Sequence, residues 1–200
     1  MAEFGEDAVA GMAIVARLTP VAFGVIFALS GAVGPIIGQN VGAGMNDRVR
    51  TAFRSALLFT AIYVVGAALI LFFLRAPIAA LFQATDEATV LIYLFCGPLA
   101  LAYFFNGSLF VANAAFNNIS HPFYSTWLNW GRHTLGTIPF VIVGASWFGA
   151  SDVLIGQAVG GVIFGLLAWG MAERLIATNT LKKKEDRFRT RPLSVLHHRR

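Results

Sequence analysis

Apolar stretches of about 20 residues follow one another along the chain, separated by short polar segments. A helix needs about 20 consecutive apolar residues to cross the ~30 Å hydrocarbon core of a membrane. The pattern therefore predicts an all-α integral membrane protein. The five expected transmembrane helices cover residues 9–37, 52–74, 90–112, 123–148 and 153–172. They form a predicted membrane bundle over residues 1–176, which is followed by a basic tail over residues 177–200.

The composition agrees with a membrane protein and argues against a soluble one. Charged residues make up 12% of the chain and hydrophobic residues 57%, whereas soluble domains carry about 25% charged residues. We therefore expect the lipid bilayer as a partner. The net charge of +5 does not indicate a nucleic-acid partner, because the basic residues concentrate in one loop and in the tail, as membrane topology requires. The single cysteine, Cys96, excludes an intrachain disulfide.

The distribution of Lys and Arg predicts how the chain is oriented in the membrane. The loop after the first span contains Arg48 and Arg50, and residues 177–200 contain eight Lys and Arg. With five spans, this loop and the tail lie on the same side, which we expect to be the cytoplasmic side of the inner membrane. The opposite side holds one Arg and six acidic residues: Arg75, Glu3, Glu6, Asp7, Asp86, Glu87 and Asp152. An acidic, external start without a signal sequence is typical of the later part of a longer protein, so an N-terminal half is an expected partner.

The end of the first span has an unusual glycine-rich sequence. Five glycines fall within the fourteen residues 31–44. Gly34, Gly38 and Gly42 are spaced by four, which lets a helix approach a neighbour closely, and Pro35 is expected to bend the helix. We interpret the segment either as tight helix packing or as a hinge at a gate. The candidate gating residues are Gly34, Pro35, Gly38, Gln39, Asn40, Gly42, Gly44 and Arg48.

Polar side chains lie on single faces of the third and fourth expected helices. Such a stripe avoids lipid and faces the bundle interior or a water-filled cavity. The candidate cavity-lining residues are Arg17, Asn106, Asn113, Asn117, Asn129, Arg132 and His133. Arg132 can instead extend its charge to the membrane surface, and His133 is a candidate proton relay because histidine titrates near neutral pH. We find no set of residues with the spacing of a catalytic or metal site.

The glycine-rich segment resembles the multidrug and toxic compound extrusion (MATE) family. Its run Pro-Ile-Ile-Gly-Gln-Asn-Val-Gly-Ala-Gly over residues 35–44 is similar to an element that follows the second helix of each six-helix half in that family. Residues 8–17 resemble the start of that second helix, and residues 129–132 resemble the fifth helix of a half. The resemblance implies helices eight to twelve of a twelve-helix transporter, which is the second six-helix bundle without its first helix.

The same resemblance implies a secondary active efflux transporter rather than an enzyme. Its small-molecule substrates would be amphipathic or cationic drugs, exported in exchange for H⁺ or Na⁺, with no cofactor besides the coupling ion. Family members use membrane-embedded carboxylates for coupling, but no Asp or Glu lies well inside an expected span. A truncated chain that acts as an inactive or scaffold membrane fragment is therefore the main alternative.

Two further alternatives have less support in the sequence. A lipid-linked oligosaccharide flippase of the related superfamily needs several convergent cations for a pyrophosphate, and only Arg17 and Arg132 are candidates. A haem-binding membrane enzyme needs two histidines that face each other across helices. His121 and His133, the only histidines outside the tail, lie on one segment, which disfavours this alternative.

Overall fold

The structure of the chain is a computed structural model that describes residues 5–139 and 149–189, with side chains through residue 179. Within these ranges the chain is helical apart from short turns. In chain order the elements are α1 (Glu6–Gly42), α2 (Asn46–Leu81), α3 (Asp86–Leu94), η2 (Phe95–Leu99), α4 (Ala100–Asn118), α5 (Pro122–Thr134) and α7 (Ala150–Arg189). The predicted all-α membrane fold is confirmed.

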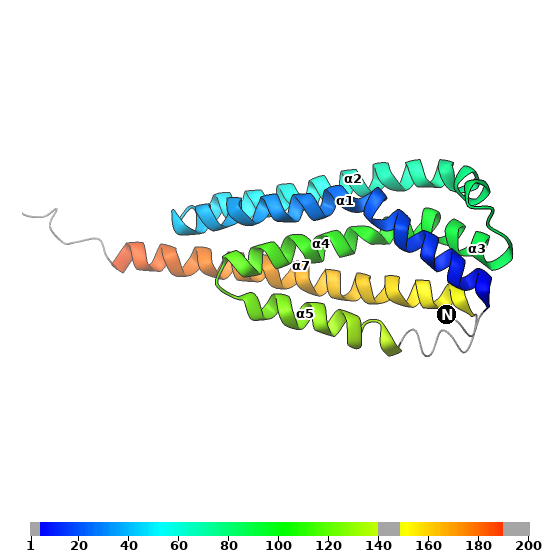
Figure 1. Ribbon diagram of the computed structural model, residues 1–200. Helices are drawn as coiled ribbons and strands as arrows, with labels where there is room; N and C mark the ends of the chain where they lie inside the picture. The colour runs from blue at the N-terminus through cyan, green and yellow to red at the C-terminus, as the bar shows by residue number, and fades with distance from the viewer. Residues whose placement is uncertain (1–4, 140–148, 190–200) are drawn as a thin grey trace, which may run out of the picture.

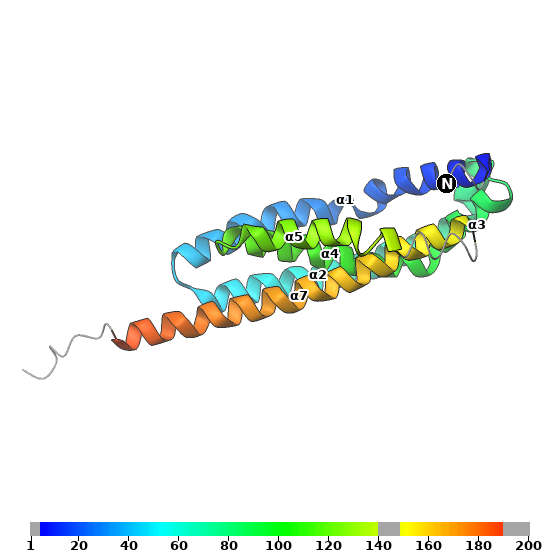
Figure 2. The same ribbon diagram turned by 90° about the horizontal axis from the view of Figure 1, so that it is seen from below.

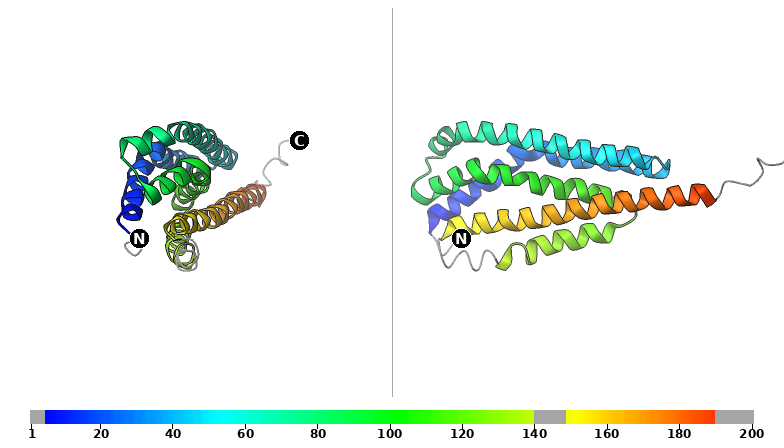
Figure 3. Two further views of the ribbon diagram at one scale, coloured as in Figure 1. Left: turned by 90° about the vertical axis from the view of Figure 1, so that its right-hand side faces the viewer. Right: turned by 180° about the vertical axis from the view of Figure 1, so that it is seen from behind.

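The helices form an elongated bundle in which α4 lies between two pairs of helices. α1 and α2 pack on one side of α4, and α7 and α5 lie on the other side (Figures 1 and 3). The α1–α2 connection, the α4–α5 connection and the far end of α7 share one end of the bundle (Figure 1). The start of α1, the α2–α3 connection and the start of α7 share the other end (Figure 1). The basic loop after α1 and the basic end of α7 are therefore on the same side, as the charge pattern predicts.

Four helical stretches are long and apolar enough to cross a membrane: Glu6–Gly42, Asn46–Leu81, Asp86–Asn118 and Ala150–Asn179. They contain four of the five expected spans. The other expected span, 123–148, begins with α5 and a turn, and its residues 140–148 lie outside the described residues. α5 runs from the end of α4 back toward the end of the bundle where α7 begins (Figure 1).

The helix α7 continues past residue 176, the predicted end of the membrane bundle. It ends at Arg189, within the predicted basic tail of residues 177–200. Residues 177–189 contain several Lys, Arg and Glu residues, which have high helix propensity, so the helix extends beyond its apolar part. Residues 190–200 of the expected tail lie outside the described residues.

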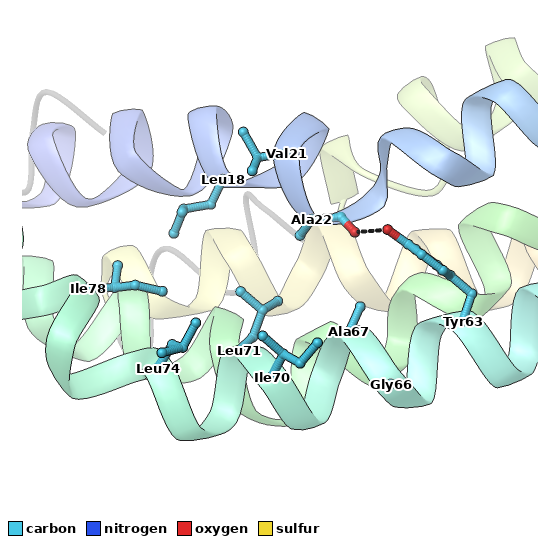
Figure 4. A pocket seen from close by; sticks show the side chains of 10 residues that line it. All are labelled: Leu18, Val21, Ala22, Tyr63, Gly66, Ala67, Ile70, Leu71, Leu74 and Ile78. Carbon is cyan, nitrogen blue, oxygen red and sulfur yellow. Dashed lines mark hydrogen bonds between the residues drawn. The ribbon is translucent and has the colours of Figure 1, made fainter.

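The helix α1 bends in its first half rather than near its end. Its dark-blue first part is inclined to its lighter second part (Figures 1 and 2), and the bend lies near Ala22 (Figure 4). Pro20 lies two residues earlier, and proline removes an amide donor and clashes with the carbonyl four residues before it. We expected the bend at Pro35, but this proline lies on the exposed side of the second part, where the helix continues.

The third expected span contains a break that the sequence analysis missed. Gly97 has non-helical torsion angles, φ −99° and ψ −113°, and Pro98 follows it. Residues Phe95–Leu99 form a π-helical turn, which joins α3 to α4. Such turns change the direction in which a helix presents its side chains and often lie at functional sites.

Two buried apolar clusters hold the bundle together, one toward each end. One cluster includes Phe23, Leu91 and Phe95, and the other includes Phe53 and Phe116 near the α1–α2 connection. Within a bilayer, close packing rather than removal from water stabilises such clusters. The first cluster also supports the cavity described next, because Phe95 belongs to both.

Candidate functional site

A polar cavity of about 230 Å³ lies beside the break between α3 and α4. Five elements contribute to it, namely α1, η2, α4, α5 and α7. The lining residues are Val15, Thr19, Phe95, Leu99, Ala102, Tyr103, Asn106, Arg132, Leu154, Gln157 and Ala158. Because the π-helical turn contributes Phe95 and Leu99, the break in the third span helps to shape the cavity.

Arg132 is the charged residue in the described lining of this cavity. It is half-buried, and its Nη1 donates a hydrogen bond of 2.7 Å to Asn106 Oδ1 on α4. A charge within a bilayer costs at least ~2.5–3.5 kcal/mol unless it finds a partner or water, and the structure provides both a partner and a cavity. Of the described residues that line the cavity, only Arg132 carries a charge. Since Asn106 is neutral, the positive charge is not compensated there.

Small residues bring Asn106 and Arg132 together. A Cβ atom on Gly161 of α7 would lie 3.1 Å from the amide atoms of Asn106. On α5, Gly131 precedes Arg132, and a Cβ atom there would lie 2.6 Å from the ring of Phe164. The glycines thus let α4 and α5 approach α7 closely, and this approach places the two polar side chains within hydrogen-bond distance.

Aromatic rings form one wall of the cavity. The Tyr103 ring stacks on Phe23 of α1, with centroids 4.0 Å apart and an interplanar angle of 8°. Phe95 meets the same Phe23 ring edge-on, at 6.3 Å. Flat, fixed rings beside a cation suit a ligand that has both an aromatic part and an anionic part.

The other predicted cavity-lining residues lie elsewhere. Asn117, His133 and Arg17 are exposed, and Asn129 donates to the carbonyl of Ser125 at 2.7 Å. Asn113 has a buried Oδ1 atom that lacks a hydrogen-bond partner among the described residues. The structure therefore brings two of the seven candidates, Asn106 and Arg132, into one site.

The glycine-rich segment contacts a residue that the sequence analysis did not select, Asn118 of α4. A Cβ atom on Gly34 would lie 3.1 Å from Asn118 Nδ2, and one on Gly38 would lie 2.7 Å from Asn118 Oδ1. A Cβ atom on Gly42 would meet nothing within 4 Å. Asn118 itself donates to the carbonyl of Ala114 at 2.8 Å. Gly34 and Gly38 thus pack against α4, and Gly42 does not.

The remaining residues of that segment lie at the surface or in the turn after α1. Pro35, Gln39 and Arg48 are exposed, and Asn40 donates to the Ile36 carbonyl of its own helix at 2.8 Å. Gly44 has φ 75°, a left-handed conformation that glycine adopts without strain. Its role is therefore to turn the chain from α1 into α2.

Polar contacts join α2 to α7 at the same end of the bundle. Arg54 donates two hydrogen bonds to Glu173, of 2.8 and 3.2 Å, and Arg50 lies 3.9 Å from the same carboxylate. Asn46 Nδ2 donates to the carbonyl of Asn179 at 3.1 Å. The sequence analysis did not select Glu173, because nothing in the spacing indicated its partner.

The chain is similar to a known protein family and to two curated proteins. The MatE family model matches residues 1–138. The chain is 36% identical to an uncharacterized 21 kDa protein in the iaaL 5′ region of Pseudomonas savastanoi, over 84% of this chain and 55% of that protein. It is 26% identical to a FAD transporter of Shewanella oneidensis, over 88% of this chain and 39% of that protein. The chain thus spans about half the length, or less, of these curated relatives.

Solved structures show the same fold. The crystal structure of the Vibrio cholerae MATE transporter VcmN in the bent form has a TM-score of 0.82 and 23% identity, and the match covers 90% of this chain and 41% of that one. A MATE structure in complex with MaL6 has a TM-score of 0.78 and 18% identity, with 88% and 40% coverage. At these identities the likeness establishes the fold.

Proposed function

The chain belongs to the MatE family of membrane transporters, and from this premise we propose that the cavity beside Arg132 forms part of a path for amphipathic, negatively charged substrates. The family and the fold indicate a transporter rather than an enzyme. The observation that carries the proposal is the uncompensated charge of Arg132, whose hydrogen-bond partner Asn106 is neutral. A cationic substrate would be repelled at this position, whereas a carboxylate or phosphate would be attracted.

The aromatic wall and the relatives support this substrate class. Phe95 and Tyr103 offer flat apolar surfaces next to the cation. FAD, the substrate in the name of the Shewanella oneidensis relative, combines aromatic rings with a diphosphate and is such a molecule. The cavity of about 230 Å³ accommodates only part of a dinucleotide, so we propose that a second half of the transporter completes the site.

The substrate class differs from the cationic drugs that the family resemblance implied. The reason is that the described residues lining the cavity include one cation, Arg132, and no acidic side chain. Export of amphipathic drugs remains the second candidate, because apolar residues such as Val15, Phe95 and Leu154 also line the cavity. Exchange for H⁺ or Na⁺, location in the inner membrane and a cytoplasmic C-terminus are further parts of the proposal. Flux measured under an imposed pH or Na⁺ gradient tests the coupling, and cysteine labelling from either side of the membrane tests the orientation.

A binding titration tests the substrate class. FAD is added to the purified chain in detergent micelles, and quenching of flavin fluorescence reports binding. We expect Arg132→Gln to weaken binding about tenfold or more, since a hydrogen bond to a charged group contributes ~1.5–3 kcal/mol. Arg17→Gln is the matched control, because Arg17 is an exposed arginine outside the cavity. Equal binding by both variants would contradict the proposed role of Arg132, and an absence of binding by the unaltered chain would favour the scaffold alternative.

A further inference from the structure

The helices on either side of the polar cavity each turn one face toward it. On α7 the lining residues are Leu154, Gln157 and Ala158, whose spacing of i, i+3 and i+4 places them on one face of the helix. On α1 they are Val15 and Thr19, which lie one turn apart. α1 and α7 both pack against α4, on opposite sides of it (Figure 3). The side chain of Gln157 therefore belongs to the face of α7 that borders the cavity.

Gln157 brings an unused carboxamide group to this cavity. The other carboxamide in the described lining, that of Asn106, already accepts a hydrogen bond from Arg132. The amides of Asn118 and Asn129 donate to carbonyls four residues earlier in their own helices. The Gln157 side chain is exposed, and its amide has no hydrogen-bond partner among the described residues. Both its oxygen and its nitrogen are therefore free to bind a ligand.

A carboxamide matches a particular chemical group on a ligand. Gln157 Oε1 accepts a hydrogen bond, and Nε2 beside it donates one. The complementary group is a lactam or imide edge, in which a ring N–H lies next to a ring carbonyl. Two parallel hydrogen bonds then form, as in the bidentate pairing of glutamine with adenine. A carboxylate has no donor and an ammonium group has no acceptor, so neither matches both atoms.

The position of Gln157 separates it from the cation by about one helical turn. Gly161 lies beside the Arg132–Asn106 hydrogen bond, because a Cβ atom on it would lie 3.1 Å from the Asn106 amide. Gln157 precedes Gly161 by four residues, which is about 6 Å along α7 at 1.5 Å per residue. α4 and α7 run in the same direction (Figure 1), and Tyr103 precedes Asn106 on α4. The Tyr103 ring and the Gln157 amide therefore lie toward the same end of the cavity.

We propose that Gln157 recognises the ring of the substrate, by forming two hydrogen bonds with a lactam or imide edge while the face of the ring lies against Tyr103. The anionic group of the same molecule lies near Arg132. This inference rests on the proposed function and narrows its substrate class to planar heterocyclic anions that carry such an edge. Anions with a plain benzene ring lack the edge and bind less tightly.

Two neutral ring compounds test Gln157 separately from Arg132. Lumiflavin has an imide edge, whereas 3-methyllumiflavin carries a methyl group on the imide nitrogen in place of the proton. Neither compound has an anionic group, so neither requires the charge of Arg132. Each is titrated into the purified full chain in detergent micelles, and the change in its fluorescence measures its affinity. Micelles without protein provide the blank.

We expect the unaltered chain to bind lumiflavin about tenfold more tightly than 3-methyllumiflavin, because the methyl group removes the donor and leaves the Gln157 oxygen unpaired. Gln157→Leu should reduce this ratio of affinities to about one, since the side chain then bonds to neither compound. Gln83→Leu is the matched control and should keep the ratio, because Gln83 is an exposed glutamine in the turn after α2, outside the cavity. A general change in stability or in binding to the micelle alters both affinities and leaves their ratio the same.

Two results would overturn the inference. One is the same ratio in Gln157→Leu as in Gln83→Leu, which would place recognition of the imide edge elsewhere. The other is a failure of the unaltered chain to bind lumiflavin or to distinguish it from the methylated ring. If Gln157→Leu does not fold, Gln157→Met, which keeps the length of the side chain without its polar atoms, gives the same decision.

The outcome for Gln157 is distinguishable from the outcome for the proposed function. The titration of FAD against Arg132→Gln and Arg17→Gln tests the attraction of an anion, and the ratio for the two neutral rings tests the edge. A normal ratio together with equal FAD binding by the two arginine variants would refute the anion site and keep the role of Gln157. A ratio of one in the unaltered chain together with weaker FAD binding by Arg132→Gln would refute the role of Gln157 alone.

Discussion

Replacing Gly38 by Ala tests the packing of the glycine-rich segment against α4. The new methyl group would lie 2.7 Å from Asn118 Oδ1, and overpacking of this kind costs about 1–3 kcal/mol. The Asn118 amide is held in place, since its Nδ2 donates to the Ala114 carbonyl at 2.8 Å and Gly34 borders it. Alanine also gains ~1 kcal/mol over glycine in helix propensity. The net expectation is a loss of about 1 kcal/mol in the free energy of unfolding.

Gly31→Ala on the same helix is the control. A Cβ atom there would meet nothing within 4 Å, so only the gain of ~1 kcal/mol from helix propensity remains. Titration of mixed micelles with SDS, followed by circular dichroism, measures both free energies of unfolding. In an Asn118→Ala background, Gly38→Ala should become stabilising as well, because the clash has been removed. If Gly38→Ala stabilises the unaltered chain as much as Gly31→Ala does, the packing argument is refuted.

Three further tests examine other contacts, each by the same unfolding measurement. Gly165→Ala should destabilise the protein by about 2 kcal/mol or more, because its methyl group would clash with a backbone carbonyl of α4. Gly170→Ala, at an open position, should stabilise it by ~1 kcal/mol. Equal effects of the two substitutions would contradict the close approach of α7 to α4. Phe23→Ala should cost about 3–5 kcal/mol because it empties a fully buried site, and a loss below ~1 kcal/mol would contradict that burial. A double-mutant cycle of Arg54→Gln and Glu173→Gln should give a small coupling free energy that disappears at high salt, since the arginine is largely exposed. A large coupling free energy that salt does not change would contradict a surface contact.

The sequence was sufficient to predict the membrane helices but not their bends. Helix length and hydrophobicity follow directly from the requirement to span hydrocarbon, so the long apolar runs predicted the helices well. The position of a bend depends on which neighbouring residue forms a hydrogen bond with the backbone group that the bend frees. Pro20 and Pro35 have the same local effect, yet the bend lies near Ala22, whose carbonyl accepts a hydrogen bond from Tyr63 on α2. That partner cannot be identified from spacing within one helix.

The candidate site also depends on contacts between helices, which the sequence pattern of a single helix does not predict. Helical periodicity placed Asn106 and Arg132 on polar faces of their helices, but it could not identify them as partners. Their hydrogen bond of 2.7 Å depends on the approach of α4 and α5 to α7, which Gly131 and Gly161 permit. Asn118 was missed because it lies beside the asparagine stripe rather than on it. Its contact with two glycines of α1 is visible only when the two helices are placed together.

The sign of the charge that the Arg132 cavity prefers tests the central claim most directly. Fluorescein and rhodamine 6G share one ring system and differ in charge, so the change in the ratio of their affinities on Arg132→Gln reports the electrostatic contribution of this residue. Fluorescence anisotropy with the purified full chain measures both. We predict that the anionic dye binds more tightly, and that Arg132→Gln lowers this preference about tenfold, while Arg17→Gln leaves it unchanged. Tighter binding of the cationic dye, unaltered by Arg132→Gln, would contradict the account.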